Sequence, residues 1–355
     1  MARTEKPPSP LGVVVALIVG CILFLAVAEI GVRLVYPDWR DFYSGRFIET
    51  EFKPGRAGVA IGRPGFNGYF AQNNGDFRVA IKINDGGLRN SEPMAAADGR
   101  IWIVGDSMAF GWGVEQPEMY SSVIARLSGK PTYNIASPGT DVCGYQALIS
   151  RMPAAAKPTA VIVGLILEND IREYHCRDEY SSPAAPAAPV ADNRNRLLNA
   201  KRWLTEYSGL YNAVAVSLKR VAPIVGALES LGMVNVEHAY KLTFDRTRVN
   251  ALALSVAEEL ANTRGMVPAG VPFAVLIAPS RFEIRDNDPL YHHLREAIAT
   301  AIEARGMDVI DPIAGFMQAG FKPTHFAHDG HWSSLGHKIA GEAAVKWVTK
   351  ALPAQ

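Results

Sequence analysis

The stretch Ile101-Trp102-Ile103-Val104-Gly105-Asp106-Ser107 decides the fold of this chain. Four consecutive apolar residues are typical of a short strand that is buried on both faces of a parallel sheet. Gly105 and Asp106 then end the strand and turn the chain. Ser107 therefore stands at the carboxyl end of a strand and near a helix N-terminus, where backbone N–H groups can stabilise a developing negative charge. A serine at such a position can also simply cap the helix.

Strands and helices alternate after this turn. The predicted helices are Val114–Leu127, Tyr145–Met152, Pro289–Arg305 and Leu335–Ala351. The remaining predicted strands are Thr132–Ala136, Ala160–Leu167, Pro272–Ala278 and Asp308–Ile310. This alternation indicates right-handed βαβ units. We therefore expect a three-layer α/β/α fold around a mainly parallel five-stranded sheet, whose carboxyl edge gathers the functional groups.

The composition fits a globular protein, with 48% hydrophobic and 20% charged residues in a chain of 355. This length accommodates one large domain with appendages, or two domains. The formal net charge of +1 gives no reason to expect a nucleic-acid partner. Three cysteines are too few for a fold built on disulfides, and Cys21 lies in an apolar segment. Cys143 and Cys176 are then the pair available to form a disulfide.

An apolar segment near the N-terminus, Leu11–Ala28, carries no charge and is about as long as a membrane-spanning helix requires. Arg3 and Lys6 precede it and favour a cytoplasmic N-terminus. We expect an uncleaved anchor, because apolar residues resume beyond the segment. Two alternatives stay open: a cleaved signal peptide with Ala26-Val27-Ala28 as its site, and a lipoprotein signal at Leu17-Ile18-Val19-Gly20-Cys21. All three place the rest of the chain outside the cytoplasm.

The chain divides into four predicted parts. These are a cytoplasmic N-terminus (1–10), a transmembrane anchor or signal segment (11–35), an irregular β-containing lead-in (36–95) and the main α/β domain (96–355). A Pro/Ala-rich linker at Ser181–Pro189 cannot hold a core, and Arg196–Leu231 is helical in pattern. We expect a helical insertion over about 178–260 that caps the carboxyl edge of the sheet, with a helix lying on the membrane as the alternative.

Residues that can carry chemistry occur in four blocks. Gly105-Asp106-Ser107 ends the first strand, Gly139 follows the second, and Asn169 follows the third. Asp329-Gly330-His331 precedes the last helix. This order resembles the SGNH/GDSL hydrolase superfamily, whose blocks carry Ser, Gly, Asn and His in turn. The resemblance implies a flavodoxin-like SGNH fold and a serine hydrolase site.

The resemblance covers about Asn84 to Leu352, apart from the helical insertion. Within it, Asn84–Arg89 and the segment from Gly105 to Val114 resemble the membrane-anchored bacterial branch of the superfamily. Any one block is a weak signal, whereas four blocks in order, each expected at the carboxyl end of a strand, are a strong one.

The chemistry of a serine nucleophile explains these residue types. A serine hydroxyl attacks an ester once a base takes its proton, and His331 is the candidate base because imidazole titrates near neutral pH. Asp329 would hold the imidazole in the right tautomer. The resemblance assigns the oxyanion hole to the backbone N–H groups of Ser107 and Gly139 and to the side-chain amide of Asn169.

The last block departs from the common pattern of the family. Many members place the acid three residues before the histidine, whereas Asp329 stands two residues before His331 and His328 takes the usual position. The order Asp-x-His-Trp does occur in anchored members and in related polysaccharide acetyltransferases, so we expect Asp329 to orient the base. A metal cluster that also includes His325 is the alternative, but this spacing is not a closed zinc motif. We expect neither a metal nor a cofactor.

Several neighbours of the blocks have structural interpretations. Asp106 supports the turn before the nucleophile, and we expect Glu168 and Asp170 at a solvated loop edge. Trp112 and Trp332 either line a substrate cleft or pack in the core.

The two cysteines of the main domain lie close to the predicted oxyanion loops. Cys143 follows Gly139 by four residues and Cys176 follows Asn169 by seven, which puts both at the same edge of the sheet. A compartment outside the cytoplasm permits a disulfide there. We predict that Cys143 and Cys176 pair and brace these loops.

The leading hypothesis is a membrane-tethered serine ester hydrolase or O-acyltransferase that forms an acyl-enzyme on Ser107. From its location and family we expect an ester or acylated cell-envelope carbohydrate as substrate. We expect the protein to be located in the bacterial inner membrane. It would cross the membrane once, with its catalytic domain in the periplasm or outside the cell. The alternative is a non-catalytic envelope-assembly or carbohydrate-binding protein that retains the fold. The sequence leaves the oligomeric state open.

Overall fold

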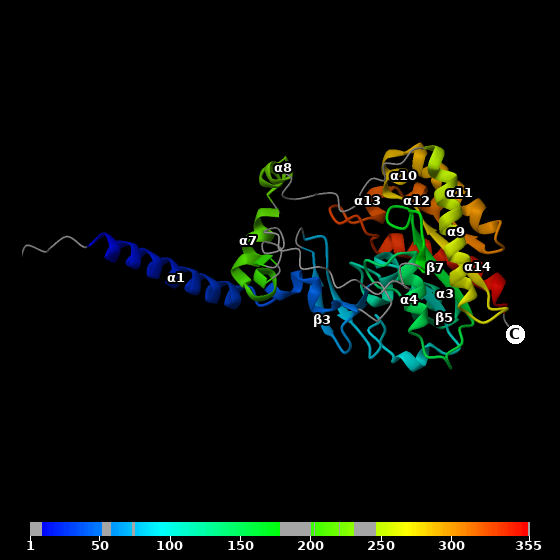
Figure 1. Ribbon diagram of the computed structural model, residues 1–355, viewed down its shortest axis with the longest axis horizontal. Helices are drawn as coiled ribbons and strands as arrows, with labels where there is room; N and C mark the ends of the chain where they lie inside the picture. The colour runs from blue at the N-terminus through cyan, green and yellow to red at the C-terminus, as the bar shows by residue number, and fades with distance from the viewer. Residues whose placement is uncertain are drawn as a thin grey trace, which may run out of the picture.

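A long helix projects from an α/β body (Figure 1). The computed structural model describes residues 9–51, 58–72, 75–177, 200–201, 203–219, 221–230 and 246–353. Helix α1 (Pro10–Val35) is capped by the Ser9 hydroxyl, which accepts the Gly12 N–H at 3.2 Å, and none of its residues is buried. It is long and apolar enough to cross a membrane, a test that a signal sequence also passes.

The central sheet has five parallel strands. They are β5 (Ile101–Val104), β6 (Thr132–Asn134), β7 (Ala160–Ile166), β8 (Phe273–Ala278) and β9 (Asp308–Ile310). Their spatial order is β6-β5-β7-β8-β9, which is the flavodoxin-like order 2-1-3-4-5. The predicted fold class is therefore confirmed, with strand ends that differ by one or two residues from those expected.

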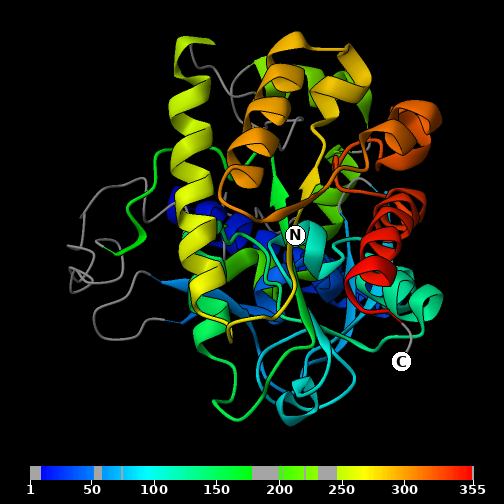
Figure 2. The same cartoon turned by 90° about the vertical axis from the view of Figure 1, so that its right-hand side faces the viewer.

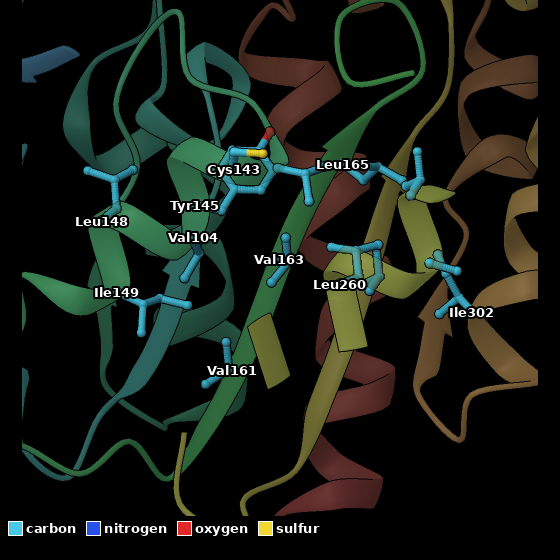
Figure 3. Close-up of a cluster of buried hydrophobic side chains, with 14 of the residues drawn as sticks. Val104, Cys143, Tyr145, Leu148, Ile149, Val161, Val163, Leu165, Leu260 and Ile302 are labelled. Carbon is cyan, nitrogen blue, oxygen red and sulfur yellow. The ribbon is translucent and has the colours of Figure 1, made fainter. Parts of the chain in front are cut away.

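Helices cover both faces of this sheet (Figure 2). One layer holds α4 (Val142–Ser150), α9 (Val249–Gly265) and α11 (Pro289–Glu303), and the other holds α3 (Tyr120–Ser128) and α14 (Ser334–Ala351). Alternate residues of a strand point to opposite faces of the sheet. Trp102 and Val104 of β5 pack in the core beneath the α4 layer, and Ile101 and Ile103 pack in the core beneath the α3 layer. Figure 3 shows the first of these cores, with Val104, Val161 and Val163 of the sheet and Leu148 and Leu260 of the helices.

Short elements connect the layers. The α-helical ones are α2 (Ser107–Phe110), α10 (Arg281–Asp286), α12 (Ile313–Ala319) and α13 (Phe321–Thr324). The 3-10 helices are η1 (Trp39–Phe42), η2 (Ser44–Arg46), η3 (Met94–Ala97), η4 (Gln116–Glu118) and η5 (Arg246–Arg248). The predicted helix Val114–Leu127 is wrong in its first turns. Glu115 and Glu118 form a capping box around η4, and Met119 is extended, so α3 begins only at Tyr120.

The lead-in forms two antiparallel hairpins. Strand β1 (Ile48–Glu51) pairs with β2 (Val59–Gly62), and β3 (Asn67–Ala71) pairs with β4 (Arg78–Lys82). Phe47, Phe70 and Ile81 belong to the same core as Ile101 and α14, whereas Val59 and Ile61 of β2 belong to the other core. The lead-in is therefore packed onto the main domain.

The helical insertion differs from the expected one in two ways. Helix α9, whose Val256 and Leu260 are fully buried, is part of the domain core, so the predicted range 178–260 extends too far. Helix α7 (Gly209–Lys219) packs on α1 and η1, so the expected cap over the carboxyl edge is wrong for this helix; α8 (Ala222–Ser230) packs on α7. The Pro/Ala-rich linker lies outside the described residues.

Candidate active site

Ser107 begins a one-turn helix directly after β5. The Asp106 side chain caps α2 by accepting the Met108 N–H at 2.9 Å, and Gly111, with φ of 80°, ends it. Gly105 is required because a Cβ there would lie 2.7 Å from the Cβ of Ala109 and 3.1 Å from the carbonyl oxygen of Gly164 in β7. This close approach of the turn to the neighbouring strand fixes Ser107 at the carboxyl edge.

His331 joins Ser107 to Asp329. Its Nε2 lies 2.8 Å from Ser107 Oγ, and its Nδ1 is hydrogen-bonded to Asp329 Oδ1. Gly330 between them has φ of 80°, a backbone conformation that lets both side chains turn to the same side. In the tautomer whose Nδ1–H donates to the carboxylate, Nε2 accepts the proton of the hydroxyl. The two-residue spacing of acid and histidine therefore allows the hydrogen-bonded chain that a triad needs.

The charges around His331 favour its protonated form. Burial alone would lower its pKa, but the charge of Asp329, the hydrogen bond to it and the charge of Asp106 outweigh burial and the opposing charge of Arg281. The pKa of His331 is consequently raised above its ordinary value of 6.5. A base of this kind accepts a proton readily from a bound hydroxyl.

The remaining blocks lie at the same edge. Asn169 Nδ2 donates to Asp106 Oδ2 at 3.4 Å, next to the nucleophile. The loop of the second block is tied to Gly105, whose carbonyl oxygen accepts from the Ser137 N–H at 3.0 Å and the Thr140 hydroxyl at 3.3 Å. Gly139 has φ of 75° and open space where a Cβ would stand. The strand order and the meeting of the four blocks are those that the resemblance implies. This arrangement resembles the fold of the SGNH/GDSL superfamily.

Solved structures with low sequence identity resemble this chain. One is a carbohydrate esterase family 2 enzyme with a carbohydrate-binding domain from Corynascus thermopiles (Myceliophthora fergusii), at 16% identity over 72% of this chain and 67% of that one, with a TM-score of 0.41. Another is a lipolytic protein of the G-D-S-L family from Veillonella parvula, at 14% identity over 71% and 98%, with a TM-score of 0.39. A third is a lipase/acylhydrolase from Enterococcus faecalis, at 11% identity over 72% and 99%, with a TM-score of 0.40. No protein-family model and no curated protein matches the chain.

The β3–β4 hairpin of the lead-in holds the last SGNH block. Gln72 Nε2 donates to Asp329 Oδ2, the oxygen that does not face His331. Asp76 Oδ2 accepts the backbone N–H groups of His328 and Asp329 at 2.9 Å each, and its Oδ1 pairs with His328 Nδ1 at 2.7 Å. Sequence reasoning missed Gln72 and Asp76, since they lie in a polar turn far along the chain from the block they hold.

We predict that Gln72→Leu lowers kcat for ester hydrolysis about ten- to a hundredfold, because a hydrogen bond to a charged group contributes about 1.5–3 kcal/mol and about 1.36 kcal/mol corresponds to a tenfold change in rate. Without this donor the carboxylate of Asp329 is held less firmly in its orientation toward His331. Steady-state kinetics on p-nitrophenyl acetate measures the effect, with Gln116→Leu on η4 as the control. Equal kcat values for the two variants would contradict a positioning role.

Two acidic residues beside Asn169 are buried, so the expectation of a solvated loop edge is wrong. Asp170 accepts from the Tyr145 hydroxyl and the Ile166 N–H at 2.7 Å each, and burial together with the charge of Asp106 raises its pKa well above the usual range. Glu168 forms an ion pair with Arg281 Nε at 3.0 Å. Glu168 and Asp170 are buried because helix α10 and the body of the domain cover the end of β7.

The Arg281–Glu168 ion pair connects two SGNH blocks. Glu168 also accepts from the Ser280 hydroxyl at 3.0 Å and the Arg281 N–H at 2.6 Å. The guanidinium of Arg281 lies directly against Gly330, where it would clash with any Cβ. Since both side chains are about nine-tenths buried, this pair holds the third and last blocks at a fixed separation.

The structure contains the predicted disulfide between Cys143 and Cys176, with a Cα–Cα distance of 5.1 Å. It links α4, which follows the Gly139 loop, to the segment after Asn169. The loops of the second and third blocks are thus joined covalently as well as by hydrogen bonds.

The other candidate side chains have packing partners. His325 pairs with Thr324 and stacks on Phe321, and burial lowers its pKa to about 3. Trp332 is fully buried and packs on Phe316, whereas Trp112 lies beside the ring of His331 at 5.8 Å between centroids. Trp112 is therefore the tryptophan that borders the site. Within the described ranges, no group of three or more His, Cys, Asp or Glu side chains is arranged to hold a metal ion.

Proposed function

We propose that this chain is a serine ester hydrolase or O-acyltransferase of the SGNH type. The observation that carries the proposal is the hydrogen-bonded chain from Asp329 through His331 to Ser107, with 2.8 Å between Nε2 and Oγ. Asp329, His331 and Ser107 then act as orienting acid, base and nucleophile. Two further contacts support this assignment: Asn169 bonds to Asp106, and the Gly139 loop is tied to Gly105.

The first half-reaction transfers the acyl group to the enzyme. Ser107 Oγ attacks the ester carbonyl carbon while its proton moves to His331 Nε2, and the carbonyl oxygen becomes an oxyanion. The backbone N–H groups of Ser107 and Gly139 and the amide of Asn169 donate to this oxygen, each contributing about 3–4 kcal/mol to the barrier reduction. His331 then returns the proton to the leaving alcohol as the C–O bond breaks, which leaves an ester on Ser107.

The second half-reaction regenerates the serine. A hydroxyl group gives its proton to His331 and attacks the acyl carbon, and Ser107 Oγ leaves with the proton from Nε2. Water as the acceptor makes the protein an esterase, and a sugar hydroxyl makes it an O-acyltransferase. The residues named are the same for both.

We place the catalytic domain outside the cytoplasm, tethered to the inner membrane by α1. The support for this is the apolar, unburied α1, the cations before it and the Cys143–Cys176 disulfide, a bond that persists in oxidising compartments. Acylated envelope carbohydrate is the substrate class that this location offers. A non-catalytic carbohydrate-binding role is the second candidate, favoured by the tether alone.

Covalent labelling tests the nucleophile directly. Full-length protein in detergent is incubated with a fluorophosphonate probe, and the adduct is mapped by peptide mass spectrometry. We expect the adduct on Ser107 and none in Ser107→Ala. Absence of labelling, together with retained glycan binding, would favour the non-catalytic candidate. Acetyl transfer from p-nitrophenyl acetate to an added oligosaccharide then distinguishes a transferase from an esterase.

Activity is expected to fall as the pH is lowered through the raised pKa of His331. The base must be neutral to take the proton of Ser107, so the protonated fraction is inactive. Because the pKa of His331 lies above 6.5, the acid limb of kcat/KM is centred above pH 6.5. The pH profile of p-nitrophenyl acetate hydrolysis, corrected for the spontaneous reaction, measures this limb. A midpoint below 6.5 would be inconsistent with the charges around His331.

A further inference from the structure

Exposed apolar side chains are concentrated in the helical insertion, in and around α7. Of the eleven large apolar side chains that are exposed in the described residues beyond α1, five lie between 203 and 221. They are Trp203, Tyr207, Val214, Leu218 and Val221, with exposed fractions between 39% and 60%, and we call them the α7 face. Val214 and Leu218 are four residues apart on α7, which puts them on one side of this helix. Trp203 and Tyr207 lie just before α7, and Val221 lies just after it.

The opposite side of α7 is attached to the protein. Asn212 and Val216 are buried, and Asn212 Nδ2 donates to the Trp39 carbonyl oxygen at 3.2 Å. Val214 and Leu218 therefore lie on the free side of an amphipathic helix, and the rest of the α7 face flanks them in the sequence. Exposed apolar side chains that gather in one segment mark a contact with a membrane or another molecule.

A carboxylate from α1 fixes where α7 lies. Glu29 accepts from the Ser208 hydroxyl at 2.9 Å, the Gly209 N–H at 2.8 Å and the Leu210 N–H at 2.9 Å, so it caps the N-terminus of α7 from another helix. Arg33, which pairs with Glu29, also donates to the Tyr207 carbonyl oxygen at 2.7 Å. Figure 1 shows α7 lying crosswise at the C-terminal end of α1.

The position of Glu29 sets the depth of α7 relative to a membrane. The uncharged stretch Leu11–Ala28 spans about 27 Å as a helix, close to the roughly 30 Å of a bilayer's hydrocarbon. Glu29 is thus the first charge beyond this stretch, and the first turn of α7 is bonded to it. A helix held crosswise at that level lies along the membrane surface.

We propose that the α7 face rests on the lipid headgroup region beside the point where α1 leaves the bilayer. This inference depends on the proposed membrane anchor. The continuity of the face with α1 argues for lipid rather than protein as the occupant, because α1 is uncharged as far as Ala28 and none of its residues is buried. Trp203 and Tyr207 also belong to the residue types that concentrate at membrane interfaces. Docking would hold the carboxyl edge at a fixed orientation to the membrane.

Spin labels measure the depth of this face in full-length protein. The protein is reconstituted in phosphatidylethanolamine/phosphatidylglycerol vesicles, and three labelled forms are compared: native Cys21, Val214→Cys and Leu127→Cys, the last two in a Cys21→Ser background. Cys143 and Cys176 do not react because they form a disulfide. Leu127 on α3 is the matched control, since it is 50% exposed like Val214 at 49%.

We expect the ratio of oxygen to nickel-complex accessibility at Val214 to be several-fold higher than at Leu127 and lower than at Cys21. Equal ratios at Val214 and Leu127, with Cys21 in lipid, would overturn the docking proposal and leave the anchor intact. A water-accessible Cys21 label would overturn both. An immobilised Val214 label that neither reagent reaches would show that protein covers the face, and would also overturn the proposal. Unchanged thermal midpoints verify that the variants are folded.

Discussion

Ser107→Ala is expected to lower kcat for ester hydrolysis about 10⁶-fold, because members of a catalytic triad act as one unit. Without Oγ there is no acyl acceptor, and His331 can at most activate a water molecule in its place. The oxyanion-hole donors remain, which leaves a small residual rate above that in water. Removal of the hydroxyl is expected to change the free energy of unfolding little, because the main polar contact of the Ser107 side chain is with His331 itself.

The same argument predicts that losses are not additive. His331→Ala should reduce kcat about as much as Ser107→Ala, and the double variant should be no slower than either. Ser137→Ala is a matched control: this buried hydroxyl lies in the second block, and among the described residues it has no hydrogen-bond partner. Pre-steady-state and steady-state kinetics on p-nitrophenyl acetate measure all four. Additive losses, or an equal loss in Ser137→Ala, would exclude Ser107 as the nucleophile.

Local sequence signals were sufficient to predict the sheet and the four blocks. The apolar run Ile101–Val104 is buried on both faces as expected, and the turn after it places Ser107 at the carboxyl edge. These features could be predicted because strand burial and turn formation depend on residues that are neighbours in sequence. The meeting of Ser107 with His331 followed from the topology of a parallel sheet and from the resemblance.

Contacts between distant segments could not be predicted in this way. Gln72 lies 257 residues before Asp329, and nothing in its local pattern indicates that a lead-in hairpin reaches the last block. The burial of Asp170 depends on Tyr145, a residue of α4, which strand periodicity does not reveal. The location of α7 likewise depends on Glu29, whose position in an apolar helix gave no indication of its partner. Each of these errors concerns a polar side chain whose partner is remote in sequence.

Asp329→Asn is expected to lower kcat about 10⁴-fold, because the amide presents the wrong hydrogen-bonding groups to His331. Gln72 Nε2 donates to one oxygen of Asp329, and His331 Nδ1 faces the other. An asparagine must keep its carbonyl oxygen toward the Gln72 donor, so its own N–H₂ group turns toward Nδ1. Nδ1 then becomes an acceptor, Nε2 carries the proton, and His331 cannot take the proton of Ser107.

This account makes the loss partly reversible by a second substitution. Gln72→Glu in the Asp329→Asn background supplies an acceptor for the amide N–H₂ group, which lets the amide oxygen turn back toward Nδ1–H and restores the productive tautomer. We expect the double variant to have a kcat well above that of Asp329→Asn alone, whereas Gln72→Leu in the same background lacks an acceptor and should recover less. In both variants the acid limb of the pH profile of kcat/KM moves to lower pH, because the charge of Asp329 that raises the pKa of His331 is gone. Equal kcat values for Asp329→Asn with and without Gln72→Glu would contradict this account. They would show that the lead-in hairpin does not control the tautomer of His331.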